Sequence, residues 1–128
     1  MAAALKLELA IISLLFLEKP HFKSKLPFET LGEIGKELEI PCNVGGSPAP
    51  RITWYRDSEP LENIGAVRYN ILQNGSLLIN YMRREDSGMF QCSAENSAGY
   101  TTGYTWLRVK SKFRLRLRLE SFNRFPPL

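Results

Sequence analysis

Residues 86–92 read Asp86-Ser87-Gly88-Met89-Phe90-Gln91-Cys92, and this stretch decides the fold. After Gly88, every second residue is apolar, which places Phe90 and Cys92 on one face of a strand expected over residues 88–96. A strand with one apolar face requires a second layer to cover that face. The stretch therefore indicates a layered β-structure with a cysteine in its interior.

A second cysteine, Cys42, ends a similar alternation over residues 38–42, and Trp54 follows it on another expected strand. Cysteines on the inward faces of two opposed sheets, with an indole between them, form the core of an antiparallel sandwich. An even pair of cysteines separated by a long loop also suggests a structural disulfide and an oxidising compartment. We therefore expect an all-β, two-sheet Greek-key sandwich joined by a Cys42–Cys92 disulfide. The expected core residues are Trp54, Phe90 and Leu107.

Short apolar segments follow one another at roughly 8–12-residue spacing from residue 19 to residue 110, which is typical of an all-β domain. Seven or eight strands are expected and essentially no helix, apart from one helical turn within residues 81–87. Residues 45–50, rich in glycine and proline, are expected to be a loop, and Asn74-Gly75 predicts a β-hairpin. The expected strands cover residues 26–30, 36–44, 51–57, 68–72, 76–80, 88–96 and 100–110.

The chain divides into an apolar N-terminal segment (1–18), the expected domain (19–110) and a basic C-terminal tail (111–128). The longest apolar run, residues 9–17, is far shorter than the ~20 residues that span a bilayer, so no membrane span is expected in this chain. That run, preceded by Lys6, has the character of a signal-peptide core, but no small-residue cleavage site follows it. A cleaved signal and the atypical start of a longer protein are both left open.

The formal net charge of +4 is unevenly distributed. Residues 110–128 carry six basic groups and one acid, whereas residues 1–109 are nearly neutral. The expected domain therefore lacks the clustered cations of a nucleic-acid-binding face. In the tail, charges alternate with apolar residues, so the tail could extend the last strand or lie on anionic membranes or heparin-like chains. We expect it to be an unselected segment that adds nothing to the sandwich core.

Residues suited to catalysis or metal binding are sparse. The single histidine, His21, and the two cysteines cannot complete a tetrahedral zinc site. No base stands beside a plausible nucleophile such as Ser87, and no phosphate-binding loop is present. The sequence therefore predicts neither an enzyme nor a cofactor, a metal or a small-molecule substrate.

Motifs of a known family are spread over residues 19–110. They are Pro20-His21-Phe22, Gly35, Ile40-Pro41-Cys42, residues 46–50, residues 52–57, residues 75–79 and residues 86–92. Together they resemble the intermediate-set immunoglobulin domains of neural adhesion molecules, the sidekick family most and the contactin family next. The resemblance implies an extracellular protein-binding module for cell-surface recognition and cell–cell adhesion, often homophilic. It also implies a fragment or short isoform of a long, membrane-anchored protein.

Phe90 departs from the family pattern, which has a tyrosine two residues before the second cysteine. Phenylalanine can fill the same corner but cannot donate the hydrogen bond of the tyrosine hydroxyl. The resemblance further implies a partly buried, bidentate ion pair between Arg68 and Asp86. The alternative is a solvated arginine that contributes almost nothing to stability.

Intracellular immunoglobulin domains of the muscle type, which bind cytoskeletal proteins as scaffolds, are the alternative class. Relatives of that type hold their cysteines as free buried thiols. The redox state of Cys42 and Cys92 therefore discriminates between the two classes.

Five side chains are expected on the outer face of one sheet. Residues that alternate with the inward Trp54, Cys92 and Leu107 point outward, and in this fold their three strands are neighbours. The five are Tyr55, Met89, Gln91, Tyr104 and Trp106. Aromatic residues and methionine are enriched at protein interfaces, so we interpret this face as a candidate binding surface, self-association included. The alternative is ordinary scattered surface aromatics, or a Trp106 covered by the tail or by a neighbouring domain.

Asn74-Gly75-Ser76 is an N-glycosylation sequon. The same residues suit a two-residue hairpin turn, which is by itself a sufficient reason for their presence. For a secreted chain we expect partial occupancy at most, because a tight turn presents Asn74 awkwardly to the transferase.

Overall fold

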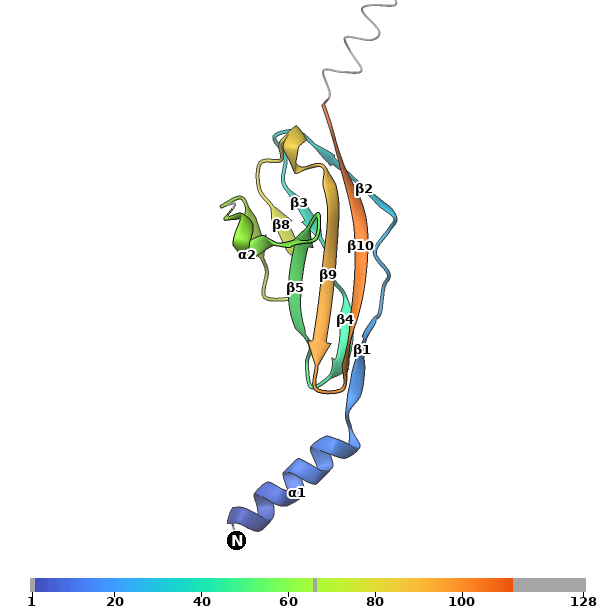
Figure 1. Cartoon of the computed structure of the whole chain (residues 1–128), viewed down its shortest axis with the longest axis vertical. Helices are drawn as coiled ribbons and strands as arrows, with labels where there is room; N and C mark the ends of the chain where they lie inside the picture. Colours follow the sequence, from blue (N-terminus) through green and yellow to red (C-terminus); the bar gives the residue numbers. More distant parts are fainter. Residues whose placement is uncertain (1, 66, 112–128) are drawn as a thin grey trace, which may run out of the picture.

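The computed structural model describes residues 2–65 and 67–111, which form a two-layer β-sandwich preceded by a helix (Figure 1). One layer is a five-stranded sheet in the order β2-β10-β9-β5-β6. Its neighbouring strands are antiparallel, except that β2 and β10 run parallel. The strands are β2 (Glu29–Glu33), β5 (Arg51–Arg56), β6 (Glu59–Pro60), β9 (Gly88–Asn96) and β10 (Gly99–Lys110).

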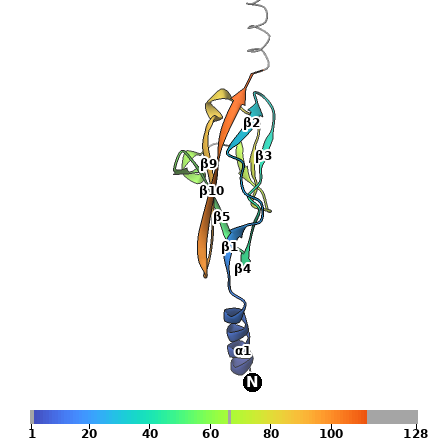
Figure 2. The ribbon, with the colours of Figure 1, turned by 90° about the vertical axis from the view of Figure 1, so that its right-hand side faces the viewer.

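The opposite layer contains a three-stranded sheet in the order β3-β8-β7 and a two-stranded pair of β1 and β4. Figure 2 shows β3 and β4 on one side of the sandwich and β5, β9 and β10 on the other. The strands of this layer are β1 (Glu18–Phe22), β3 (Leu38–Ile40), β4 (Val44–Ser47), β7 (Tyr69–Ile71) and β8 (Leu77–Ile79).

The core lies between the layers and is built from alternate residues of the facing strands. In β9, Phe90, Cys92 and Ala94 are buried, whereas the residues between them are not. Trp54 and Leu107 are buried in the same core, as expected from their parity. Burial of a large apolar side chain contributes about 1.5–3 kcal/mol, so this alternation supplies much of the stabilisation.

The expected first strand of the sandwich, over residues 26–30, is wrong. Instead, β1 lies before that segment and pairs with β4, while β2 pairs with the last strand, β10. The apparent alternation of Leu26 and Phe28 was misleading, because Leu26 packs against the core whereas Phe28 is 72% exposed. Pairing with strands distant in sequence, rather than the local pattern, sets these boundaries.

Residues 45–50 are only partly the loop that their glycines and prolines predicted. Val44–Ser47 forms β4, whose register with β1 places Phe22 opposite Val44 and His21 opposite Gly45. Glycine weakens a strand interior without forbidding it, and β4 is short with a single partner strand. With β4 and the two-residue β6, the described residues form ten strands rather than the seven or eight expected.

Helices are minor, but two of them were not anticipated. A 3-10 turn at Arg84–Asp86 lies inside the segment for which a helical turn was expected. The one-turn α2 (Leu61–Ile64) follows β6, and α1 (Ala2–Leu15) occupies the apolar N-terminal segment and projects away from the sandwich (Figure 1). Over residues 2–65 and 67–111 no helix has the length and apolar character needed to cross a membrane. The expectations for the C-terminal tail fall almost wholly on residues 112–128, outside the described residues.

The hairpin expected at Asn74-Gly75 joins β7 to β8, but its loop is longer than two residues. The Leu72 N–H donates to the Ser76 carbonyl at 2.8 Å, and the Gly75 N–H donates to the Leu72 carbonyl at 2.9 Å. Gly75 has a φ of +89°, in the left-handed region. This is the three-residue loop in which a turn is followed by a left-handed residue, and it favours glycine at the last position.

Candidate protein-binding face

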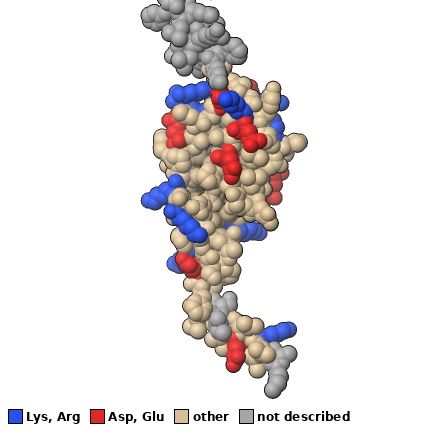
Figure 3. Space-filling model, turned by 180° about the vertical axis from the view of Figure 1, so that it is seen from behind, with Lys and Arg blue, Asp and Glu red and all other residues tan. Residues whose placement is uncertain are grey.

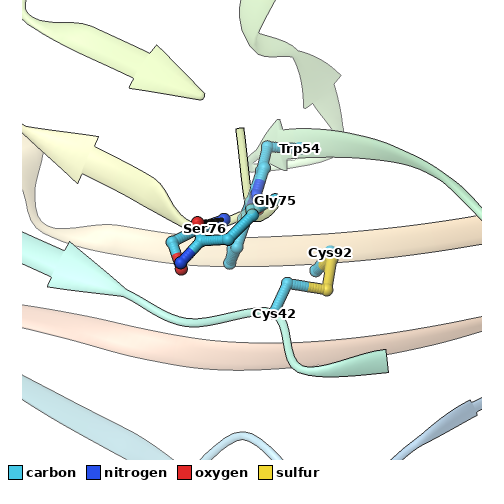
Figure 4. The surroundings of a disulfide bond; sticks show 6 residues. Cys42, Trp54, Gly75, Ser76 and Cys92 are labelled. Carbon is cyan, nitrogen blue, oxygen red and sulfur yellow. Dashed lines mark hydrogen bonds between the residues drawn. A yellow bond between two sulfur atoms is a disulfide. The ribbon is translucent and has the colours of Figure 1, made fainter. Parts of the chain in front are cut away.

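Cys42 and Cys92 form a disulfide that joins the two layers. Cys92 belongs to β9, whereas Cys42 lies between β3 and β4 in the opposite layer. Trp54 on β5 stands beside Cys92 in register and is 1% exposed. Its Nε1–H donates to the Gly75 carbonyl at 2.8 Å, so the indole connects β5 to the β7–β8 hairpin of the other layer (Figure 4).

Asp86 is a fully buried carboxylate surrounded by hydrogen-bond donors. Arg68 donates to it through both terminal guanidinium nitrogens, at 2.7 and 2.9 Å, in bidentate geometry. The Arg83 backbone N–H donates at 2.7 Å and the Tyr69 hydroxyl at 2.5 Å. Burial alone would raise the pKa of Asp86, but the hydrogen bonds from Arg68, Tyr69 and Arg83 outweigh it and hold that pKa at about 2.

Tyr69 is a member of this cluster that sequence reasoning missed. Its ring meets Phe90 edge-on, with 5.9 Å between the ring centroids. Phe90 lacks the hydroxyl of the family tyrosine, and Tyr69 brings a hydroxyl into its neighbourhood from β7. Burial, followed by the hydrogen bond to Asp86, raises the pKa of Tyr69 to about 12. Its only sequence signal was its place next to Arg68.

The five side chains expected on the outer face of the five-stranded sheet lie together there. Tyr55, Gln91 and Tyr104 form one row across β5, β9 and β10, and Met89 stands opposite Trp106 in the next row. Tyr104 is 50% exposed and Trp106 is 45% exposed, while the other three are half-buried. We call the surface formed by these five residues the aromatic face.

Leu31 extends the aromatic face onto β2, and sequence reasoning missed it. The parallel pairing of β2 with β10 places Leu31 opposite Arg108, and Leu31 is 55% exposed. Arg108 lies two residues after Trp106 on β10 and therefore shares its face. It forms an exposed ion pair with Glu29 at 3.3 Å. The register between strands so far apart in sequence carries no local signal, which is why this neighbour could not be foreseen.

A groove of about 550 Å³ borders the aromatic face at Tyr104. Its apolar walls include Phe22, Leu26 and Phe28, and Lys25 also lines it. On the opposite side of the molecule, basic and acidic side chains are interspersed among the other residues (Figure 3). The aromatic face and its groove thus bring together aromatic, methionine and other apolar side chains, which are residue types enriched at protein contacts.

Side chains suited to metal binding are dispersed. His21 is exposed on β1 and lies 3.4 Å from Glu18. Both cysteines are held in the disulfide. Within residues 2–65 and 67–111, no three His, Cys, Asp or Glu side chains are grouped to hold a metal ion.

The family of the fold follows from comparison with known proteins. The family model described as "Immunoglobulin domain" matches residues 19–96. The chain belongs to the immunoglobulin domain family. The expected all-β immunoglobulin-like sandwich with its Cys42–Cys92 disulfide is thereby confirmed.

Curated relatives of this immunoglobulin domain include protein sidekick-1 of Mus musculus, which is 39% identical over 93 residues. That match covers 73% of this chain and 4% of the relative. Protein sidekick of Drosophila melanogaster is 38% identical over 96 residues, covering 74% of this chain and 4% of the relative. The expected resemblance to sidekick is confirmed, and the chain spans about 4% of the length of these relatives.

Solved structures give the same result for the immunoglobulin domain. Sidekick-1 immunoglobulin domains 1-4 align with a TM-score of 0.71 at 38% identity, covering 73% of this chain and 25% of that one. The titin I-band fragment I67-I69 aligns with a TM-score of 0.64 at 28% identity, covering 74% and 34%. The sandwich is thus shared by sidekick-1 and titin domains, and function must be argued from the site.

Proposed function

We propose that this immunoglobulin domain is a non-catalytic protein-binding module that serves cell-surface recognition and cell–cell adhesion outside the cell. The similarity to sidekick domains supports the adhesion class. The disulfide between Cys42 and Cys92 supports an oxidising compartment. The proposal includes a larger multidomain adhesion protein as the context in which the domain works.

The observation that carries this proposal is the aromatic face. Tyr104 and Trp106 are large, rigid side chains about half exposed on an open sheet, next to the exposed Leu31. Tryptophan and tyrosine dominate binding hot spots because they bury much area at little conformational-entropy cost. The groove beside Tyr104 would receive an apolar side chain of the partner. The partner is a protein, and a second copy of the chain is one candidate.

Replacing Tyr104 and Trp106 together by serine is expected to abolish binding. Truncation of a hot-spot aromatic costs about 2 kcal/mol or more of binding free energy, and two such losses exceed what a weak adhesive contact can bear. The measurement is aggregation of beads coated with the chain, together with binding of the labelled chain to cells. Because both side chains are exposed, the melting temperature should stay close to that of the parent.

Tyr100→Ser is the matched control, since Tyr100 is 76% exposed on the same strand, with the same parity, at the far end of β10. It should leave both binding readouts unchanged. Equal binding by the parent and the double variant would remove the aromatic face from the proposal.

A scaffold of the muscle type is the second candidate, because titin domains share the fold at 28% identity. In that class Cys42 and Cys92 would be free thiols in the cell. Alkylation of the protein in a native lysate without reductant distinguishes the two classes. We expect neither cysteine to be modified, and modification of both would favour the scaffold.

A further inference from the structure

We propose that Asn74 carries an N-linked glycan, and that the glycan is attached before the β7–β8 hairpin closes. Asn74-Gly75-Ser76 forms the acceptor sequon in the loop between these strands. The inference rests on the proposed extracellular function, because the modification requires passage through the secretory pathway. It goes further by assigning a modification site and the order of two events.

The folded loop leaves room for the sugar. Asn74 is exposed, and its Oδ1 accepts a hydrogen bond from the Ser76 N–H at 3.0 Å. A backbone N–H can be satisfied only by an acceptor, so this bond fixes which end of the amide turns toward the loop. Nδ2 is the opposite end of the same planar group. A sugar on Nδ2 therefore leaves the bond to Ser76 intact.

A groove beside the loop would accommodate the base of the glycan. It has a volume of about 380 Å³ and is lined by Asn74 together with Ala49 and Pro50, among others. Both of these neighbours are nonpolar side chains without charge, so a sugar ring resting there displaces no ion pair. The folded protein can thus carry the modification without rearrangement of the hairpin.

The same loop is nevertheless a poor acceptor once it has folded. Ser76, whose hydroxyl completes the sequon, is 3% exposed, and its N–H is held by Asn74. Gly75 is buried as well, and its carbonyl accepts the hydrogen bond from the Trp54 indole. A transferase must approach the asparagine amide and the serine hydroxyl together. Attachment must therefore precede docking of the hairpin against Trp54.

The chemistry is a group transfer from a lipid-linked oligosaccharide diphosphate. A bond forms between Nδ2 of Asn74 and the anomeric carbon of the first sugar, and the bond from that carbon to the diphosphate oxygen breaks. The amide loses one proton, and the lipid diphosphate leaves with the bonding electrons. No oxidation or reduction takes place.

The location of the glycan bears on binding. The hairpin belongs to the sheet β3-β8-β7, in the layer opposite the sheet that carries Tyr104 and Trp106. A glycan at Asn74 would shield the surface around the hairpin and leave the aromatic face open. It would therefore restrict protein contacts to the five-stranded sheet.

The test uses the full chain behind a cleavable signal sequence, with a second sequon in a flexible C-terminal linker as an internal reference. Intact mass and electrophoretic mobility are compared before and after glycosidase for the parent, for Asn74→Gln, and for the Cys42→Ala/Cys92→Ala variant. We expect partial occupancy at Asn74 in the parent and none in Asn74→Gln. Occupancy should rise in the double cysteine variant, because loss of the cross-link slows or prevents closure of the hairpin.

The inference would be overturned if the linker sequon is glycosylated but Asn74 carries no sugar in both the parent and the cysteine variant. Partial occupancy that does not rise in the cysteine variant would overturn the proposed order of events. Neither result touches the proposed adhesive function. That function fails instead if Cys42 and Cys92 are free thiols in the native source, which is a separate measurement.

Discussion

Replacement of Asp86 by asparagine is expected to lower the free energy of unfolding by about 3–5 kcal/mol, the usual cost of breaking a buried charge pair. The fully buried carboxylate accepts from Arg68, Tyr69 and the Arg83 N–H. Asparagine keeps one acceptor oxygen and turns the other into a donor, which leaves part of this set unsatisfied and the guanidinium without its counter-charge. Urea unfolding followed by tryptophan fluorescence measures the loss.

Glu85→Gln is the control, because Glu85 lies in the same 3-10 turn, is exposed, and loses the same charge. Its effect should stay within about 0.5 kcal/mol, as for most surface substitutions. Acid titration adds a second readout, since the pKa of Asp86 is held at about 2, below its ordinary 3.8. The stabilisation is therefore fully present above about pH 4 and is lost as the pH falls toward 2. Equal losses in the two variants, or an unchanged acid transition in Asp86→Asn, would show that the pair is not structurally important.

Much of the sandwich could be predicted because its determinants are local. Strict alternation around Cys92 fixes which side chains face inward, and a tryptophan between two inward cysteines suits few other folds. The same parity predicted the aromatic face, and the register of β5, β9 and β10 brings Tyr55, Gln91 and Tyr104 into one row. Alternation on neighbouring strands therefore extends from core to surface without further information.

The features that could not be predicted depend on contacts distant in sequence. Pairing of β1 with β4 makes a strand of glycine-rich residues that have no strand propensity of their own. Parallel pairing of β2 with β10 sets Leu31 beside Arg108 across 77 positions of the chain, as their residue numbers show. Tyr69 reaches Asp86 from another strand, where it offers a hydroxyl that Phe90 lacks. In each case the partner strand decides, and a single sequence does not name its partner.

Removal of the disulfide by Cys42→Ala/Cys92→Ala is expected to lower the free energy of unfolding by about 4 kcal/mol, from the chain-entropy cost of a loop of this length. The cysteines are 50 residues apart in sequence, so the bond constrains a large part of the unfolded domain. Small domains are stable by only about 5–15 kcal/mol in total, so a large fraction of the variant should be unfolded near body temperature. The fluorescence of buried Trp54, which stands beside Cys92, reports the transition.

Reduction of the parent separates the two ways in which the disulfide can act. If the bond stabilises by constraining the unfolded chain, a reductant should shift the urea midpoint of the parent nearly as far as the double substitution does. The variant itself should not respond to reductant, because the chain has only these two cysteines and both are replaced. A reduced parent that keeps its stability, beside a variant that loses it, would assign the effect to lost packing of two sulfur atoms next to Trp54. It would also weaken the case for an oxidising compartment, since the domain would then fold as well with free thiols as with the cross-link.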